Sequence, residues 1–311
     1  MMTVISVVLA LIGLLVLLYL AYPGWVYDKL VQLGRKRGGT VERKVLVNGR
    51  LWPYLEGGRS GAETVVLIHG FGGDKDNWTL YAPFMTEHYR VIMPDLPGFG
   101  DNERRIGDDY SIKAQADRLK AFLDAIGIDK CHLGGNSMGG FIVLRFALDY
   151  PERLHSLTLL NNAGVRGTAE SELEQAVARD PLAKPLAVRS LADLDRLLVM
   201  ATYQPPRIPG AFKRVMYERF KPYEVLLDQI FEQMLQSLQE DDMNSKLGDI
   251  TTPTLIIWGR HDRLIDVSCT QVLQRGIKNS ELVIFEDVGH VPMIEQPART
   301  ASAQRAFLAK H

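Results

Sequence analysis

Hydrophobic residues follow two alternating patterns along the chain. Short continuous apolar runs, typical of strands buried in a parallel sheet, lie between stretches with the three-to-four-residue apolar spacing of amphipathic helices. The predicted strands are 44–47, 51–55, 64–68, 90–94, 131–133, 157–160, 254–258 and 282–285. The helices expected between them are 77–88, 111–126, 138–149, 267–277 and 299–309. This alternation predicts an α/β fold with a doubly wound, mostly parallel sheet.

The stretch 164–249 interrupts the alternation, because it contains prolines and helical patterns but no convincing strand. Its helices are expected at 171–178, 191–201 and 223–239. The pattern predicts a helical cap, or lid, inserted between two strands of the sheet. The α/β core then consists of 45–163 and 250–311.

The N-terminus has a different composition from the rest of the chain. Residues 1–27 carry no charged side chain, and 4–22 are almost wholly apolar. As a helix, this run would extend roughly 28 Å at about 1.5 Å per residue, close to the hydrocarbon thickness of a bilayer. Residues 1–27 are therefore predicted to be a membrane anchor with a transmembrane helix. The alternative is a cleaved signal peptide of a secreted or periplasmic protein, which calls for a basic start and a small-x-small cleavage site, neither of them clear here.

Basic residues follow the apolar run, and none precedes it. They are Lys29, Arg35, Lys36, Arg37, Arg43 and Lys44. Because basic flanks stay on the cytoplasmic side, a single-pass protein with its bulk on the cytoplasmic face is expected. Residues 28–44 are predicted to be a basic juxtamembrane linker that lies against anionic head groups.

Overall composition narrows the function classes. Hydrophobic residues make up 46% and charged residues 23% of the 311 residues, which is typical of a globular protein with an ordinary core. The formal charge of −1 gives no reason to expect nucleic-acid binding, which usually uses a concentrated basic face. The only two cysteines, Cys131 and Cys269, supply neither a disulfide framework nor a metal cluster. No metal and no cofactor are expected.

Ser137 is the first candidate for chemistry, because it lies where a predicted strand ends and a helix begins. Gly135 and Gly139 flank it in the pattern G-x-S-x-G. In a nucleophile elbow, these glycines let a strained turn and the following helix approach the backbone closely. The alternative is a serine that caps a helix in a glycine-rich turn, and the pentapeptide alone does not separate the two.

A serine nucleophile needs a base, and the base needs a carboxylate that orients it. His290 follows the predicted strand 282–285 and lies at the sheet edge where Ser137 is also expected. Asp262 leaves the strand 254–258 at the same edge, whereas Asp266 is expected to cap the next helix. The strand end after the elbow helix carries Asn161 and Asn162 but no acid.

An acyl-transfer site also needs donors for the oxyanion. The backbone N–H of Met138, directly after the serine, is one candidate, and that of Phe71 in the loop HGFGG is the other. A phosphate-binding loop is the alternative for HGFGG, but the glycine patterns of such loops are absent. His69 is expected to brace the loop and not to act as a second base.

The motifs HGFGG, DLPGFGDN, GNSMGG, WGRHD and VGHVPMIEQP occur in this order. Together they resemble the α/β-hydrolase superfamily over about 45–311. With the N-terminal anchor, the chain looks most like membrane-anchored monoacylglycerol lipases and related bacterial lipases and esterases. The resemblance implies ester hydrolysis through an acyl-enzyme and a cap over an acyl pocket. It gives the roles of triad to Ser137, Asp262 and His290, and of oxyanion donors to Phe71 and Met138.

Two other functions remain open from the sequence. Carbon–carbon bond hydrolases of ring-cleavage products share GNSMGG, but they usually carry Trp after the catalytic His, where this chain has Val291. A non-catalytic binding protein with the same fold would typically lack a triad member. The expected partners are a lipid or small-molecule ester and the membrane. Cap residues that could line an acyl pocket, although such residues more often pack in a core, are Met200, Tyr203, Phe231 and Met234.

Overall fold

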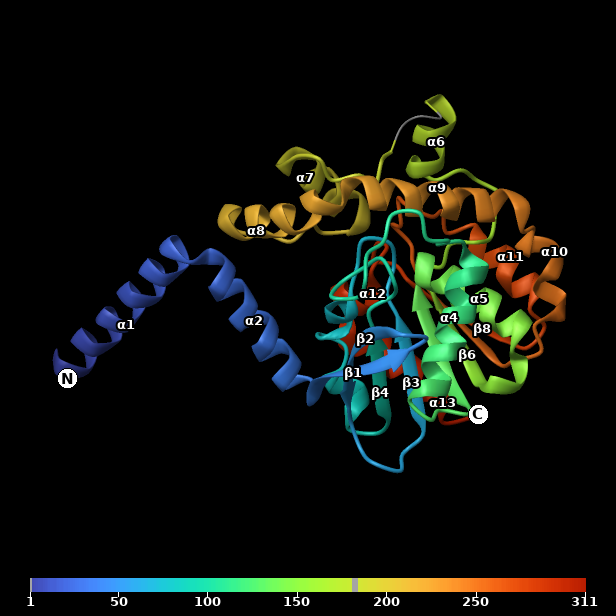
Figure 1. Cartoon of the computed structure of the whole chain (residues 1–311), viewed down its shortest axis with the longest axis horizontal. Coiled ribbons are helices and arrows are strands. Elements are labelled where there is room, and N and C mark those ends of the chain that lie inside the picture. Colours follow the sequence, from blue (N-terminus) through green and yellow to red (C-terminus); the bar gives the residue numbers. More distant parts are fainter. Residues whose placement is uncertain (1, 181–183) are drawn as a thin grey trace.

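The computed structural model describes residues 2–180 and 184–311. One eight-stranded sheet with helices on both faces forms the body of the molecule, and a layer of helices covers one edge of it (Figure 1). The strands are β1 (Thr40–Val47), β2 (Arg50–Gly57), β3 (Thr64–Ile68), β4 (Arg90–Pro94), β5 (Cys131–Asn136), β6 (Leu154–Leu160), β7 (Thr254–Gly259) and β8 (Ser280–Phe285). Their order in the sheet is β1-β2-β4-β3-β5-β6-β7-β8. The predicted α/β fold is confirmed.

The first two strands form an antiparallel hairpin, and β2 also pairs antiparallel with β4, whereas the remaining pairs are parallel. The hairpin turns at Asn48 and Gly49, whose φ angles are 48° and 81°. Two consecutive positive φ angles are the geometry of a tight hairpin turn that Asn-Gly adopts at low cost. The strands predicted at 44–47 and 51–55 form this hairpin, and both are longer than their hydrophobic pattern indicates.

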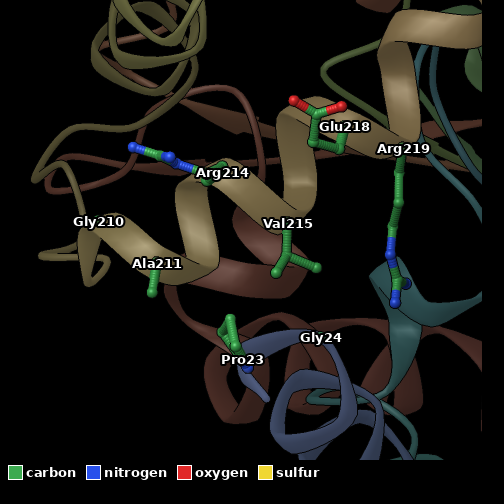
Figure 2. Close-up of a pocket in the computed structure, with 8 residues that line it drawn as sticks. All are labelled: Pro23, Gly24, Gly210, Ala211, Arg214, Val215, Glu218 and Arg219. Atoms are coloured by element: carbon green, nitrogen blue, oxygen red, sulfur yellow. The ribbon is translucent and has the colours of Figure 1, made fainter. Parts of the chain in front are cut away.

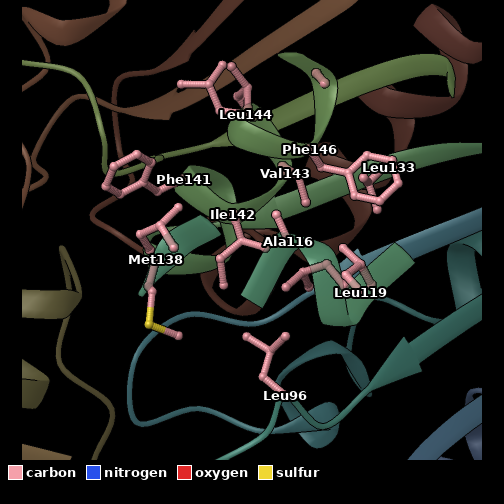
Figure 3. Close-up of a cluster of buried hydrophobic side chains, with 14 of the residues drawn as sticks. Leu96, Ala116, Leu119, Leu133, Met138, Phe141, Ile142, Val143, Leu144 and Phe146 are labelled. Carbon is pink, nitrogen blue, oxygen red and sulfur yellow. The ribbon is translucent and has the colours of Figure 1, made fainter. Parts of the chain in front are cut away.

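The helices of the core are α3 (Pro83–Thr86), α4 (Ile112–Ala125), α5 (Met138–Asp149), α11 (Cys269–Gly276), α12 (Pro292–Glu295) and α13 (Pro297–Leu308). Helix α4 begins after Ser111, whose side chain accepts a hydrogen bond from the Ala114 N–H, as expected of an N-cap. Helix α5 lies in the centre of the core. Figure 3 shows Ile142 of α5 beside Ala116 of α4. Because α5 is apolar on most of its surface, it is fixed by packing, and the turn before it is held in place.

The predicted helix 77–88 is wrong in its extent. The structure has a 3₁₀ turn, η1 (Lys75–Trp78), and the short helix α3, which begins at Pro83. A proline inside a continuous helix would remove one hydrogen bond and clash with the preceding turn, so a new helix starts there. The predicted helix 299–309 is present as α13, which begins at Pro297, and the short helix α12 before it was not predicted.

The cap comprises α6 (Glu172–Arg179), α7 (Leu191–Ala201), α8 (Gly210–Phe220), α9 (Glu224–Glu240) and α10 (Met243–Lys246). Short 3₁₀ turns, η2 (Pro151–Arg153), η3 (Lys221–Tyr223) and η4 (Leu247–Asp249), complete the described elements. The cap lies between β6 and β7 in the chain, as predicted, and the long helix α9 crosses the top of the core (Figure 1).

Two helices precede the sheet, α1 (Met2–Ala21) and α2 (Pro23–Arg37), and they extend away from the core at an angle to each other (Figure 1). A membrane span needs about 20 apolar residues in one helix. Among the residues that the structure describes, no helix is long and apolar enough for this, so the predicted transmembrane helix is not supported. Side chains of residues 1–3, 9–12 and 14–15, within the predicted anchor, lie outside the described set.

Residues 28–44, expected to be a basic linker, comprise the rest of α2, a two-residue turn and the first part of β1. The Arg35 guanidinium donates to both carboxylate oxygens of Asp76 at 2.7 and 2.6 Å and to Glu42 at 2.5 Å. Its charge is therefore engaged with the core and is not free for anionic head groups.

Helix α2 also contacts the cap. Tyr27 packs its ring against Phe212 of α8, and Arg219 pairs with Asp28 and lies over the Tyr27 ring. A cavity of about 660 Å³ lies between the two helices (Figure 2). Figure 2 shows Val215 of α8 pointing toward the start of α2.

Candidate active site

Ser137 lies in the strained turn between β5 and α5. Its φ and ψ angles are 56° and −122°, a region that non-glycine residues rarely occupy. The turn is held by main-chain bonds, since the Ser137 N–H donates to Leu160 O at 3.1 Å and its carbonyl accepts from Ala163 N at 3.0 Å. Ser137 is half-buried, and its side chain does not cap α5. The geometry matches a nucleophile elbow and not the capping alternative.

The flanking glycines are required by close backbone packing. A Cβ on Gly135 would lie 2.4 Å from Gly139 O, and a Cβ on Gly139 would lie 2.4 Å from His69 O. Any side chain at either position would push apart the turn, the helix α5 and the loop after β3. The glycines thus let Ser137 and the loop HGFGG approach each other.

Asp262 and His290 lie together at the same edge of the sheet. His290 Nδ1 is 2.8 Å from Asp262 Oδ2, and both side chains are buried. Asp262 follows β7, and His290 lies in the loop between β8 and α12. A buried carboxylate at Nδ1 holds the imidazole with Nε2 free to accept a proton.

Asp262 is itself fixed by three donors. Its Oδ1 accepts from the N–H groups of Leu264 at 2.8 Å and Ile265 at 3.0 Å, and its Oδ2 accepts from Asn161 Nδ2 at 2.7 Å. Asn161 directly follows β6 and has a φ angle of 43°, a conformation that lets its amide face Asp262. Asp266 does not reach His290. It accepts from Ser268 N at 2.8 Å. The N-cap residue of α11 is Ser268 and not Asp266, and no side chain caps this helix, so the predicted capping role of Asp266 is wrong.

The side chain of Asn136, the residue before Ser137, connects the elbow to the loop that carries His290. The Asn136 Nδ2 donates to the carbonyl of His290 at 3.0 Å and to that of Leu160 at 3.0 Å. Within the described residues, no hydrogen bond joins Ser137 Oγ to His290. Such contacts are often long before a substrate is bound. The structure therefore brings Asp262 and His290 into contact and bonds the residue before Ser137 to the His290 main chain.

The loop HGFGG lies beside the serine, because a Cβ added to Gly70 would lie only 3.0 Å from the Cβ of Ser137. His69 is fully buried, its Nδ1 is 2.8 Å from Gly70 O, and its Nε2 accepts from Leu96 N at 3.0 Å. Because Nε2 accepts a main-chain N–H, the proton is on Nδ1 and donates to Gly70 O. Burial lowers the pKa of His69, which keeps the ring neutral. These contacts agree with the bracing role expected for His69.

Phe71 and Met138, the expected oxyanion donors, are neighbours in the chain of Gly70 and Ser137, which approach each other closely. Met138 is the first residue of α5, and Phe71 lies in the loop directly after Gly70. Within the described part of the chain, the N–H of neither residue has a hydrogen-bond acceptor. The two N–H groups are therefore available for a ligand.

The four residues expected in an acyl pocket differ in their burial and in their distance from the site. Phe231 of α9 is buried and packs its ring 5.7 Å from that of Phe71, and Met234 is buried in the same apolar cluster. Met200 is buried next to Ala201, whose carbonyl accepts the His290 N–H at 2.9 Å. Tyr203 is 42% exposed, and its ring stacks on His261 at 4.4 Å. Phe231 and Met200 thus lie near the site, whereas Tyr203 packs at its margin.

The sequence analysis did not predict the roles of three supporting residues. Asn161 lies at a strand end on the edge where the triad acid is expected, and this position is the sequence signal for its supporting role. Glu295 accepts from Gly289 N at 2.9 Å and Tyr203 N at 2.7 Å, and burial raises its pKa. It joins the His290 loop to the cap. Lys75 is a buried cation just after HGFGG.

Comparison with known proteins places this arrangement in a family. The family model described as alpha/beta hydrolase fold matches residues 63–297. Lipase 1 of Psychrobacter immobilis is 35% identical over 284 residues, which cover 90% of this chain and 88% of that protein. The human monoacylglycerol lipase ABHD6 is 27% identical over 266 residues, covering 82% of this chain and 78% of that protein.

Solved structures agree in fold. A membrane phospholipase A, described as a bacterial virulence factor, is 38% identical, with a TM-score of 0.89 over 100% of this chain and 99% of that one. A meta-cleavage product hydrolase of Pseudomonas fluorescens is 27% identical, with a TM-score of 0.74 over 86% of this chain and 97% of that one.

Proposed function

The chain belongs to the α/β-hydrolase fold family, and we propose that it hydrolyses carboxylic esters of lipids through an acyl-enzyme intermediate on Ser137. The main support for this proposal is the strained backbone of Ser137 at the elbow, together with the buried Asp262–His290 pair at the same edge of the sheet. The enzyme class agrees with the sequence prediction: the chain is a carboxylic ester hydrolase of the α/β-hydrolase class, since lipases align over nearly all of it.

In the proposed mechanism, His290 Nε2 takes the Ser137 proton as Oγ attacks the ester carbonyl. Asp262 keeps the other imidazole nitrogen protonated and stabilises the imidazolium that forms. The imidazolium then gives its proton to the leaving alkoxide, and the acyl group remains on Ser137. A water molecule, deprotonated by His290, releases the fatty acid in the second half of the cycle.

The charge that develops on the carbonyl oxygen needs fixed donors. We assign this role to the N–H groups of Phe71 and Met138, which have no acceptor within the described residues. One such donor contributes about 3 kcal/mol to the stability of the transition state. The acyl chain is proposed to lie under the cap against Phe231 and Met200, with Met234 behind them and Tyr203 at the margin.

The proposed substrate is a monoacylglycerol or a similar lipid ester. The lipase and monoacylglycerol lipase names of the relatives support this class, and a buried apolar surface next to the serine suits an acyl chain. Ring-cleavage product hydrolases are a second candidate, because they are among the similar structures at 27% identity. An assay panel with both substrate types separates the two.

We further propose that the N-terminal helix α1 associates with lipid membranes. Its described apolar side chains are widely exposed, namely Val4, Ile5, Val7, Val8, Val16, Leu17 and Leu20. Exposed apolar surface of this extent usually marks a binding face. The membrane phospholipase A that aligns over the whole chain supports the same idea.

Covalent labelling tests the nucleophile directly. A fluorophosphonate probe is expected to label the protein at Ser137, and Ser137→Ala is expected to abolish labelling and lower kcat by up to about 10⁶. A folded Ser137→Ala protein with unchanged labelling would disprove the proposed mechanism. The ester panel, with graded acyl length and monoacylglycerols, is expected to show turnover of esters and none of ring-cleavage products.

A further inference from the structure

A charged cluster lies behind the loop HGFGG, and the proposed mechanism does not use it. Lys75 begins η1 and is 1% exposed, and Asp95 directly follows β4 and is 0% exposed. Asp101, in the motif DLPGFGDN, is the third member, and its side chain is largely exposed. The cluster therefore joins the loops that leave β3 and β4.

Both oxygens of Asp95 are bound to Lys75. The Lys75 ammonium lies 2.8 Å from Asp95 Oδ2 and 2.6 Å from Asp101 Oδ2, and the Lys75 main-chain N–H donates to Asp95 Oδ1 at 2.7 Å. Asp101 N donates to Asp95 Oδ2 at 2.8 Å. A Cβ on Gly100 would lie 2.2 Å from Asp95 Cγ, so the loop closes tightly around this carboxylate.

The same segment after β4 holds the other end of HGFGG. Leu96 N donates to His69 Nε2 at 3.0 Å, one residue from Asp95. The loop from His69 to Lys75 is thus attached to residues 95 and 96 at both of its ends. Phe71, the proposed oxyanion donor, lies between these attachments, and the Gly73 N–H to Gly70 O bond of 3.1 Å forms the turn around it.

Burying the charge of Lys75 costs free energy. If the side chain served only to fill space, an apolar residue at this position would give a more stable protein. Burial tends to lower the pKa of Lys75, but attraction to Asp95 and the bond to Asp101 raise it above its ordinary value. The ammonium is therefore charged throughout the physiological range and keeps both attachments.

We infer that Lys75 is a positioning residue for the oxyanion site: by clamping the end of the loop to Asp95, it aims the Phe71 N–H at the oxygen that becomes charged. This inference rests on the proposed function. A positioning role differs from a purely structural one in its effect on kinetics. Removal of the Lys75 ammonium is expected to weaken transition-state stabilisation more than substrate binding.

The test compares Lys75→Met with the wild type on a soluble ester at temperatures well below unfolding. We expect kcat to fall at least tenfold. The upper limit is the loss of a whole oxyanion donor, which lowers kcat by about 10² to 10³-fold. KM is expected to change less than threefold. The affinity for an alkyl boronic acid, which forms a tetrahedral adduct with the serine, is expected to fall by the same factor as kcat. Lys75→Arg is expected to retain most of the activity.

Arg153→Met is the matched control. Arg153 is also a buried cation, and it bonds to Ile128 O at 2.7 Å and Asp129 O at 2.5 Å and pairs with Asp124. It precedes β6 at the sheet edge opposite Ser137, so it should lose a comparable amount of thermal stability with kcat unchanged. Equal stability loss in both variants, with kcat and boronic-acid affinity unchanged in Lys75→Met, would overturn the inference.

A second variant covers the case in which Lys75→Met does not fold. Lys75→Met combined with Asp95→Asn leaves no unpaired buried carboxylate, and it is expected to fold and to show the same kcat loss. A folded double variant with wild-type kcat contradicts the clamp. If Ser137→Ala still turns over esters, the proposed function fails; unchanged kcat in the Lys75 variants with normal Ser137 labelling refutes only the clamp.

Discussion

At the scale of single residues, the Asp262–His290 contact gives the sharpest test of the site. Asp262→Asn would replace the acceptor at His290 Nδ1 by a group that can hold the imidazole in the wrong tautomer. We expect kcat to fall by roughly 10⁴ with little change in KM. The measurement is steady-state kinetics on a soluble ester, together with circular dichroism to establish that the variant folds.

Asp266→Asn is the control for that experiment. Within the described residues, the Asp266 side chain accepts only from Ser268 N, so the loss of this one hydrogen bond is expected to cost at most about 1 kcal/mol of stability and to leave kcat unchanged. Loss of activity in the Asp266 variant with a normal Asp262 variant would reverse the assignment of the triad acid.

Asp74 provides a pH-dependent prediction. Burial, together with the nearby Asp95 and Asp76, raises its pKa from 3.8 to about 7. The folded state therefore holds a proton that the unfolded chain releases, and the stability from this group falls as pH rises from about 4 to 7 and then levels. Asp74→Asn removes this fall, so the variant should gain stability over the wild type by at most about 1.4 kcal/mol per pH unit in that range.

Urea unfolding of both proteins at several pH values between 4.5 and 8 checks this. The difference in unfolding free energy is expected to grow up to about pH 7 and to be constant above it. Parallel stability curves for the two proteins would show that Asp74 is ionised throughout.

The residues of the site differ in how far the sequence predicts them. Ser137, Asp262 and His290 each follow a strand end and carry reactive groups, so pattern and chemistry point to them together. Asn161 and Lys75 have no reactive role of their own, and their importance depends on distances across loops that are far apart in the chain. Such distances are set by the packed fold and not by local pattern.

At the scale of elements, the contact between α5 and the loop after β3 determines the shape of the elbow. Gly139→Ala would place a methyl group 2.4 Å from His69 O and 2.5 Å from Ile68 O, both main-chain atoms that cannot move aside easily. We expect a loss of about 1–3 kcal/mol in stability and a large loss of kcat, because the HGFGG loop is displaced. Thermal unfolding and ester kinetics measure both.

Gly248→Ala is the matched control, since no heavy atom lies within 4 Å of the added Cβ and its φ angle is not positive. It should leave stability and kcat close to wild type. An active, stable Gly139→Ala protein would mean that the elbow tolerates more space than the structure gives it.

Element boundaries were predicted to within one residue where hydrophobic periodicity was continuous, as in α4, α5, α7, β3, β4 and β7. Strands β5 and β6 are each three residues longer than predicted. The prediction failed at 77–88 because apolar spacing alone does not register the effect of Pro83. The hairpin extended beyond its apolar pattern, since main-chain pairing of β1 with β2 continues through polar residues such as Glu42 and Arg43. Pairing of this kind depends on the neighbouring strand.

At the scale of the whole molecule, the N-terminal helices combine two separable features. Helix α1 carries exposed apolar side chains, whereas α2 is bound to the core through the Arg35–Asp76 pair and to the cap through Asp28 and Arg219. A deletion of residues 1–22 removes the first feature and keeps most of the second, and a deletion of residues 1–38 removes both. The two truncations therefore separate membrane binding from the stability of the catalytic body.

The shorter truncation is expected to keep kcat on a short, water-soluble ester within about twofold, because Ser137, Asp262 and His290 lie outside it. Its rate on long-chain monoacylglycerol in lipid vesicles should fall substantially, since the protein no longer gathers at the surface where the substrate is dissolved. The longer truncation should show the same vesicle defect and a further loss of about 1–2 kcal/mol in unfolding free energy, from the lost Arg35 bonds to Asp76 and Glu42. Vesicle flotation, soluble-ester kinetics and urea unfolding measure the three effects, and undiminished flotation and vesicle activity of the shorter truncation would exclude α1 as the membrane-binding element.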